Sequence, residues 1–250
     1  MNNDVKAGSI CVSQVSKRLG RRSVLEGLNF TAESGQIIGI LGPNGAGKTT
    51  FLRLLSTLMR ADKGTIEMAG YQLPNEAAFV RRAVGFASHA PLLYTGLSAE
   101  ENLRFYTRLY DLSDSDHLIQ NILELVGLSG KRHDQVRTFS RGMQQRLALG
   151  RAILHHPKIL LLDEPFNGLD LDACERFAGF IKRTTAEGMT VLLASHQLSG
   201  IELLADRFDI LIDGHITRSC SKNEIKSYGL EEIYRENLKT VKAQSSRRLI

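Results

Sequence analysis

Short apolar runs rich in isoleucine, valine and leucine alternate along the chain with longer stretches in which apolar positions recur every three or four residues. The runs at residues 37–41, 159–162 and 191–194 are almost continuously apolar, which is typical of parallel strands that are buried on both faces. Helical periodicity follows each run, at residues 51–59, from Leu171 onward and at residues 199–205. This order predicts an α/β fold in which helices cover a mostly parallel sheet.

The N-terminal part of the chain has a different pattern. Residues 10–15 and 24–30 read as strands on either side of a turn at Gly20, and residues 65–68 read as a further strand. Strands that are close in sequence and joined by tight turns usually pair antiparallel. We therefore expect an antiparallel β layer at the edge of the α/β core.

The middle of the chain is rich in helical signals and has no strand signal between them. Helical periodicity marks residues 98–112, 117–126 and 141–155. Ser98 precedes Glu101 by three positions, which is the pattern of a capping box at a helix start. We interpret about residues 90–157 as an α-helical subdomain inserted into the core.

The chain has 250 residues, of which 42% are apolar and 24% charged, and this is the composition of an ordinary globular protein. We expect a single domain over residues 1–220, followed at residues 221–250 by a C-terminal helical extension and a basic tail. No apolar run approaches the roughly 20 residues of a membrane-spanning helix, and the N-terminus lacks the regions of a secretory signal. These features predict a cytoplasmic protein. The net charge of +5 does not by itself indicate a partner.

A glycine-rich motif lies between the run at residues 37–41 and the helical stretch after it. The motif fits G-x-x-x-x-G-K-[ST], the pattern of a phosphate-binding P-loop, in which backbone N–H groups and a helix N-terminus bind phosphates. Its lysine is expected to reach the β- and γ-phosphates, its first threonine to coordinate Mg²⁺ and the next threonine to contact the α-phosphate. The predicted nucleotide-binding residues are Gly42, Pro43, Asn44, Gly45, Ala46, Gly47, Lys48, Thr49 and Thr50.

Two carboxylates, Asp163 and Glu164, directly follow the run at residues 159–162. We expect Asp163 to hold Mg²⁺ together with Thr49, and Glu164 to polarise the water that attacks the γ-phosphate. The two motifs together indicate a P-loop NTPase core with a nucleoside triphosphate and Mg²⁺ as its ligands. Kinases, GTPases, helicases and transporter ATPases share this combination.

A third motif, Phe-Ser-Arg-Gly-Met-Gln-Gln-Arg, begins another helical stretch. Ser140 is placed to cap this helix and Gly142 permits close backbone approach, so the helix end is a second candidate anion site. With this motif the chain resembles the ATP-binding-cassette (ABC) family over about residues 10–219. The resemblance implies a nucleotide contact for Ser140, Arg141, Gly142 and Met143. Arg141 and Met143 depart from the family signature Leu-Ser-Gly-Gly-Gln.

Other positions correspond to further elements of the same family. The resemblance implies that Asp170 belongs to the D-loop and contacts the nucleotide, and that His196 is the switch histidine, a catalytic residue at the γ-phosphate. His89 stands where the family has a glutamine that touches Mg²⁺, so it is expected to take that metal contact. Leu19 stands where the family has an aromatic residue that stacks on adenine, and we expect weaker base stacking.

The resemblance also implies partners. In this family ATP lies between the P-loop of one subunit and the signature helix of another, so this chain is expected to pair, as a homodimer or with another ABC subunit, when ATP binds. It is expected to act peripherally at the inner face of the cell membrane, on separate integral-membrane transporter subunits. Cassettes that act on nucleic acid usually carry two P-loops or a long heptad insertion. The chain has neither, so no nucleic-acid partner is expected.

The cargo remains open between two classes. Residues 88–94, 100–110 and 140–146, with histidine at the glutamine position, resemble the ATPase of the haem exporter used in cytochrome c maturation. Residues 229–236 resemble the ends of ABC-2-type export ATPases for drugs, lipids and polysaccharides. A soluble cassette ATPase that takes no part in transport is a third alternative, because it would share every motif above.

Overall fold

The computed structural model describes residues 8–88, 90–196 and 201–247, and a six-stranded sheet forms its centre. The strands are β3 (Ile37–Leu41), β6 (Val84–Ala87), β7 (Ile159–Asp163), β8 (Thr190–Ser195), β9 (Arg207–Ile212) and β10 (His215–Ser221). They lie in the order β10-β9-β3-β8-β7-β6, and each neighbouring pair is parallel except β10 and β9. β3, β7 and β8 are buried along their whole length, as expected for inner strands covered on both faces.

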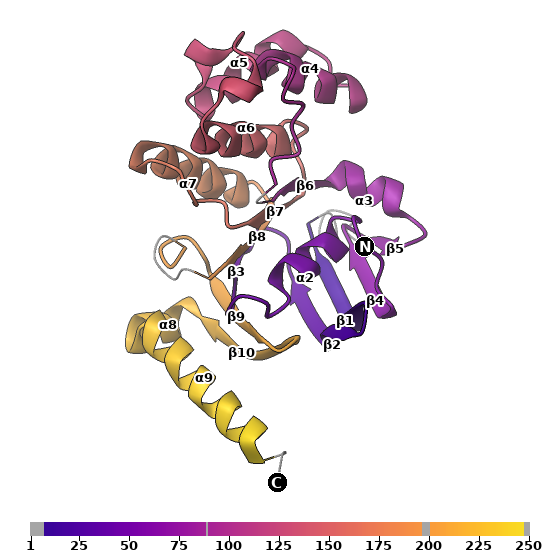
Figure 1. Ribbon diagram of the computed structural model, residues 1–250, viewed down its shortest axis with the longest axis vertical. Helices are drawn as coiled ribbons and strands as arrows, with labels where there is room; N and C mark the ends of the chain where they lie inside the picture. The colour runs from indigo at the N-terminus through magenta and orange to yellow at the C-terminus, as the bar shows by residue number, and fades with distance from the viewer. Residues whose placement is uncertain (1–7, 89, 197–200, 248–250) are drawn as a thin grey trace.

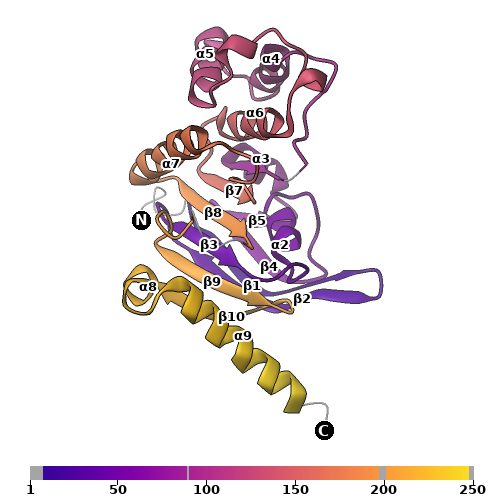
Figure 2. The same cartoon turned by 60° about the vertical axis from the view of Figure 1, so that its left-hand side comes forward.

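A four-stranded antiparallel sheet packs beside this centre. Its strands are β1 (Ile10–Leu19), β2 (Arg22–Ala32), β4 (Lys63–Met68) and β5 (Tyr71–Leu73), in the order β2-β1-β4-β5. The tip of the β1–β2 hairpin projects to one side of the molecule (Figure 2). This sheet is the predicted antiparallel layer.

Helices cover the sheets and extend the molecule at both ends (Figure 1). The helices of the described residues are α2 (Lys48–Leu55), α3 (Ala77–Ala83), α4 (Ala99–Leu109), α5 (Ser115–Leu125), α6 (Arg141–Ile153), α7 (Leu171–Ala186), α8 (Lys222–Tyr228) and α9 (Leu230–Arg247), with short 3₁₀ turns η1 (Ser129–Lys131) and η2 (Val136–Thr138). α4, α5 and α6 gather at one end, and α8 and α9 lie at the other. The capping box at the start of α4 is confirmed, since Ser98 and Glu101 each accept the other's backbone N–H.

Helix α2 is held between the two sheets by its apolar side chains. Phe51 meets Phe30 of β2 edge to face, with ring centroids 5.3 Å apart, and both belong to a buried cluster that also contains Ile38 and Ile40 of β3. Burial of each large apolar side chain contributes about 1.5–3 kcal/mol. This packing fixes the N-terminus of α2 against the carboxyl end of β3, where the glycine-rich motif connects the two elements.

The fold class predicted from the pattern is confirmed, but two helix predictions were wrong in extent. The first helix ends at Leu55 instead of continuing to Met59, because Thr57 adopts a left-handed backbone with φ 63°. The helix predicted at residues 199–205 begins outside the described residues. Its described part is a turn in which the N–H groups of Leu204 and Ala205 both donate to the carbonyl of Ile201.

The apolar pattern also left several elements unpredicted, among them α3, β5, β6, β9 and β10. β6 has four residues and includes a glycine, and most of β10 is not buried, so neither has a long apolar signal. Among the described residues, no helix combines the length and the apolar character that crossing a membrane requires.

Candidate functional site

The glycine-rich motif needs glycine at two positions because neighbouring backbone there leaves no room for a side chain. A Cβ on Gly42 would lie 2.2 Å from the carbonyl oxygen of Leu211, and one on Gly47 would lie 3.0 Å from that of Val24. Gly47 also has φ 111°, in the left-handed region that favours glycine. It occupies the N-cap of α2 without a side-chain cap, so the first N–H groups of α2 remain available to an anion.

The side chain of Lys48 reaches back across the loop to its first two residues. Its side chain is buried, and its Nζ donates to the carbonyl oxygens of Gly42 at 2.6 Å and Pro43 at 3.1 Å. Burial lowers the pKa of Lys48, an effect that the nearby carboxylates of Glu164 and Asp163 oppose. A phosphate bound in the loop would offer the ammonium group a charged partner in place of these carbonyls.

Asp163 ends β7 and meets the start of α2. The hydroxyl of Thr49 donates to Oδ2 of Asp163 at 2.8 Å, although the two residues lie far apart in sequence. Burial raises the pKa of Asp163, and the hydrogen bond from Thr49 opposes this effect. A hydroxyl and a carboxylate oxygen beside a phosphate-binding loop are hard ligands of the kind that Mg²⁺ takes with phosphate oxygens, so this pair fits the metal.

Glu164 is held by the end of the neighbouring strand. Its backbone N–H donates to the carbonyl of Ala194 at 2.9 Å, and its φ of 53° turns the chain away from the sheet. Its Oε1 lies 2.8 Å from the backbone N of His196 and 2.6 Å from Nδ1 of the same residue. Its Oε2 accepts the hydroxyl of Ser195 at 2.9 Å. The parallel pairing of β7 and β8 therefore brings Glu164 and His196 together.

These groups open on one cavity of about 650 Å³. The residues that line it are Leu19, Arg22, Val24, Asn44, Gly45, Gly47, Lys48, Thr49, Thr50, Asp163, Glu164, Asn167 and His196. The cavity thus unites most of the P-loop with the acidic strand end and the histidine. Arg22, Val24 and Asn167 were not predicted as site residues. The hairpin that supplies the first two is visible in the sequence, but its position over the loop is not.

The residues of the signature-like motif lie elsewhere. Ser140 is the N-cap of α6, and its Oγ accepts the N–H of Met143 at 3.2 Å. A Cβ on Gly142 would lie 2.4 Å from the carbonyl oxygen of Gly168, so this helix end packs closely on the loop before α7. Neither these residues nor Arg141, which is exposed, line the cavity.

Asp170 belongs to this second cluster too. It caps α7 by accepting the N–H of Ala173 at 2.8 Å, and its other oxygen lies 3.9 Å from Nη1 of Arg146 on α6. Within one chain, then, Asp170 lies with the signature-like motif and not among the residues that line the cavity. The predicted metal contact of His89 falls on a residue outside the described ones.

Comparisons with known proteins identify a family model and several relatives that match most of this chain. Residues 25–167 match the family described as ABC transporter. The ABC transporter ATP-binding protein YhcH of Bacillus subtilis strain 168 is 40% identical over 82% of this chain and 67% of the relative. The linearmycin resistance ATP-binding protein LnrL of the same organism is 34% identical over 85% and 69%. The lantibiotic transport ATP-binding protein SrtF of Streptococcus pyogenes is 33% identical over 91% and 96%.

Solved structures have the same fold. An ATP-binding subunit of an ABC transporter superposes with a TM-score of 0.85 at 29% identity, over 92% of this chain and 99% of the other. A dimeric post-hydrolysis state of the ATP-binding cassette MJ0796, bound to ADP and Pi, superposes with a TM-score of 0.79 at 24% identity, over 85% and 98%. This second likeness concerns the fold alone.

Proposed function

The chain belongs to the ABC transporter family as an ATP-binding ATPase subunit, and from this premise we propose that two copies close on Mg²⁺ and ATP and thereby drive export through separate membrane subunits. The observation that carries the proposal is the separation of two helix N-termini, each of which is a candidate anion site. The N-terminus of α2 opens on the cavity, whereas Ser140 and Gly142 at the N-terminus of α6 lie outside it. A second chain that presents its α6 over the cavity would complete the site.

Within the cavity one set of residues would bind the phosphates and the metal, and another would take part in hydrolysis. The P-loop backbone and Lys48 would hold the phosphates, and Thr49 with Asp163 would hold Mg²⁺, which neutralises charge on the phosphates when bound. Glu164 would accept a proton from the attacking water. Since His196 Nδ1 lies on the Glu164 carboxylate, it holds the carboxylate in place and leaves Nε2 as the ring nitrogen available to the γ-phosphate.

A groove beside the cavity-forming core supports contact with membrane subunits. It runs between the end of α2, β6, α4 and α6, next to the segment that follows β6. Leu58 and Leu92 line it and are 58% and 48% exposed, which leaves apolar surface for a partner helix. The exposed Arg81 at the same groove would favour a partner segment with an acidic side chain. A membrane subunit bound at this groove would hold the chain peripherally on the inner face of the membrane.

ABC-2-type export of a drug, lipid or polysaccharide is the better supported of the two open cargo classes. Two of the relatives are named for linearmycin resistance and lantibiotic transport, and both align over more than four fifths of this chain. Haem export for cytochrome c maturation has no support from the relatives described above. It remains the second candidate, on the sequence resemblance alone.

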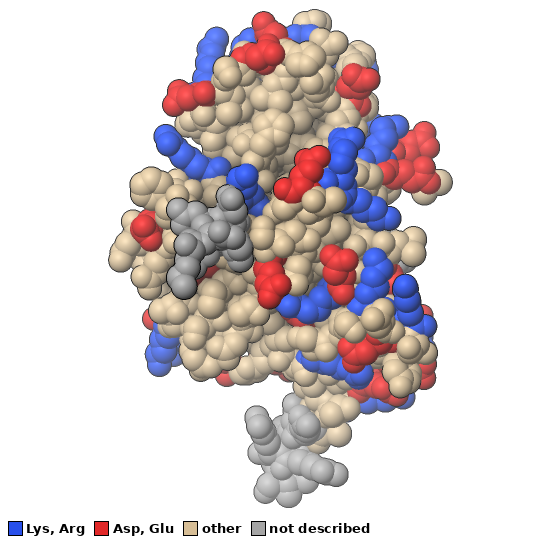
Figure 3. Space-filling model, turned by 180° about the vertical axis from the view of Figure 1, so that it is seen from behind, with Lys and Arg blue, Asp and Glu red and all other residues tan. Residues whose placement is uncertain are grey.

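A nucleic-acid partner is not part of the proposal. On the face that Figure 3 shows, Lys and Arg side chains lie among Asp and Glu side chains and form no continuous basic stripe. The charge pattern of this face is that of a solvated protein surface.

Complementation between two inactive variants tests the shared site. Lys48→Ala removes the P-loop cation and Gly142→Asp disrupts the α6 end, so each variant alone should lack ATPase activity. If each site takes one part from each chain, a mixed dimer contains one intact site. Mixing should then restore turnover, to roughly a quarter of the wild-type rate for random pairing and independent sites. No recovery in a mixture shown to form mixed dimers would contradict the shared site.

Membrane recovery tests the transporter role. The tagged chain is co-expressed with multi-span proteins from neighbouring genes, and we expect it in the membrane fraction. The groove variant Leu58→Asp/Leu92→Asp should leave that fraction, while Leu109→Asp, which changes a leucine that is 62% exposed outside the groove, should stay. Recovery of an active ATPase solely in the soluble fraction would favour the soluble cassette alternative.

A further inference from the structure

The phosphate contacts account for only part of the cavity wall. The P-loop, Asp163, Glu164 and His196 line the part where phosphates and metal would lie. Apart from Asn167, which follows Glu164 by three positions, the remaining wall comes from the β1–β2 hairpin, through Leu19 at the end of β1 and Arg22 and Val24 at the start of β2. A nucleotide with its phosphates in the loop must place its base against this hairpin.

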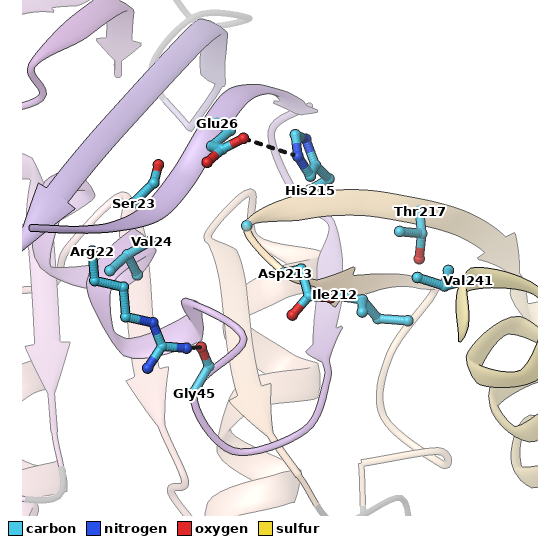
Figure 4. A pocket seen from close by; sticks show the side chains of 11 residues that line it. Arg22, Ser23, Val24, Glu26, Gly45, Ile212, Asp213, His215, Thr217 and Val241 are labelled. Atoms are coloured by element: carbon cyan, nitrogen blue, oxygen red, sulfur yellow. Dashed lines mark hydrogen bonds and ion pairs between the residues drawn. The ribbon is translucent and has the colours of Figure 1, made fainter. Parts of the chain in front are cut away.

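Arg22 is oriented by the P-loop itself. Its Nη2 donates to the carbonyl oxygen of Gly45 at 3.4 Å, and Figure 4 shows the side chain running from β2 down to the loop. A second cavity of about 560 Å³, drawn in Figure 4, shares Arg22, Val24 and Gly45 with the first. Arg22 is exposed and lines both cavities, so its guanidinium plane is not enclosed by other side chains.

The chemistry of this wall decides how it can hold a base. No Phe, Tyr or Trp side chain lines the described part of the cavity, and its one aromatic ring, that of His196, lies on Glu164 at the phosphate side. Leu19, which is 43% exposed, offers an apolar edge, and Arg22 offers the only planar side chain of the hairpin wall. Guanidinium planes stack on nucleobases and add a cation–π attraction. Leu19, Arg22 and Val24 bring no carboxylate or amide to this wall, so their side chains have no acceptor for the amino group of adenine.

We propose that Arg22 is the base-stacking residue of this nucleotide site, and that the site selects purine over pyrimidine triphosphates with little distinction between ATP and GTP. The larger ring system of a purine stacks more strongly than that of a pyrimidine. Adenine and guanine are distinguished by hydrogen bonds to their edges, which this wall does not offer. The hydrogen bond to Gly45 holds the guanidinium at the loop and links base contact to the P-loop. The inference rests on the proposed nucleotide function of the cavity and adds its base specificity.

Calorimetric titration of the purified chain separates base binding from phosphate binding. The ligands are ATP, GTP, CTP and inorganic tripolyphosphate, each with Mg²⁺, and the variants are Arg22→Ala and Arg22→Lys. Arg21→Ala is the matched control, because it removes a neighbouring exposed positive charge that does not line the cavity. Thermal melting establishes that each variant is folded.

For the wild type we expect ATP and GTP affinities within about threefold of each other and a weaker affinity for CTP. Arg22→Ala and Arg22→Lys should both lower ATP affinity about tenfold and leave tripolyphosphate affinity unchanged, because lysine keeps the charge but not the plane. Arg21→Ala should bind all four ligands as the wild type does.

Three results would overturn the proposal. Full ATP affinity in either Arg22 variant would mean that the guanidinium plane does not stack on the base. An equal loss for tripolyphosphate would assign Arg22 to the phosphates. A strong preference for GTP would indicate that Arg22 reads the guanine edge. Failure of the wild type to bind both ATP and tripolyphosphate would instead refute the nucleotide function itself.

Discussion

Nδ1 of His196 lies 2.6 Å from Oε1 of Glu164, and the backbone N–H of His196 reaches the same oxygen at 2.8 Å. Because Ser195 holds the other oxygen, all the side-chain contacts of Glu164 described above come from the end of β8. The position of the expected catalytic base is therefore set by the strand beside its own, and a change at β8 should affect turnover without touching the phosphate loop.

Substitution of this pair should separate chemistry from binding. Glu164→Gln removes the proton acceptor and should lower ATP turnover at least about 100-fold, the usual contribution of a general base, with ATP affinity nearly unchanged. His196→Ala should lower turnover less, since the carboxylate remains but loses a contact. Steady-state assays and ATP titrations measure both effects. His117→Ala on α5, an exposed histidine, is the control, and wild-type turnover in Glu164→Gln would rule out the assigned base.

The close approach of Gly142 to Gly168 predicts a substitution that lowers turnover and leaves ATP binding to the monomer intact. In Gly142→Ala the new Cβ would lie 2.4 Å from the carbonyl of Gly168, so the N-terminus of α6 must move. Overpacking of this kind costs about 1–3 kcal/mol. Because Gly142 lies outside the cavity of its own chain, ATP binding to the monomer should persist while turnover falls. Gly130→Ala in η1, whose Cβ would meet nothing within 4 Å, should leave both unchanged. A loss of monomer ATP binding in Gly142→Ala would contradict this arrangement.

Asp163 should lower the stability of the free protein near neutral pH. Burial raises its pKa above the ordinary value of 3.8, so ionising this carboxyl costs more in the folded chain than in the unfolded chain. The penalty is absent at low pH and develops as pH rises above that ordinary value. Asp163→Asn keeps an acceptor for Thr49 and removes the charge. We expect its melting temperature at pH 7 to rise above that of the wild type, with Mg²⁺-dependent turnover lost. A lower melting temperature would show that the ion is net stabilising.

His155 predicts a loss of stability in mild acid. Its ring stacks on Tyr110 with centroids 4.0 Å apart, and its Nε2 lies 3.2 Å from the carbonyl oxygen of Val84. Burial lowers its pKa from 6.5 to about 4, so between these values the unfolded chain binds a proton that the folded chain does not. Stability is retained above 6.5 and falls as pH drops toward 4, by at most about 1.4 kcal/mol per pH unit from this group.

The variant His155→Phe isolates that contribution. Phenylalanine keeps the stacked ring and cannot be protonated, so its free energy of unfolding should fall less steeply than that of the wild type between pH 6.5 and 4. Urea unfolding at several pH values provides the comparison, and contributions from other titrating groups cancel in the difference. Equal slopes would show that His155 is protonated as easily in the folded chain as in the unfolded chain.

The local elements on which the expected site residues stand were predicted correctly. The loop from Gly42 to Lys48 joins a buried strand to a helix, Asp163 ends a buried strand, and Ser140 caps a helix. Each of these features follows from residues a few positions apart, because turn geometry, strand burial and capping are local. The weak elements were missed for the same reason. β6 is too short for an apolar period, and much of the surface of β10 is exposed.

The sequence by itself therefore determined which chemical groups the chain carries and on which local elements they stand. Only the tertiary structure decided which of them meet. The order of β3, β8 and β7 in the sheet brings His196 to Glu164, and the packing of α2 brings Thr49 to Asp163. The same packing places Arg22 on the cavity wall. Such contacts join residues far apart in the chain. They form because the strand order and the burial of apolar side chains minimise the free energy of the whole core. A local sequence pattern contains no information on either.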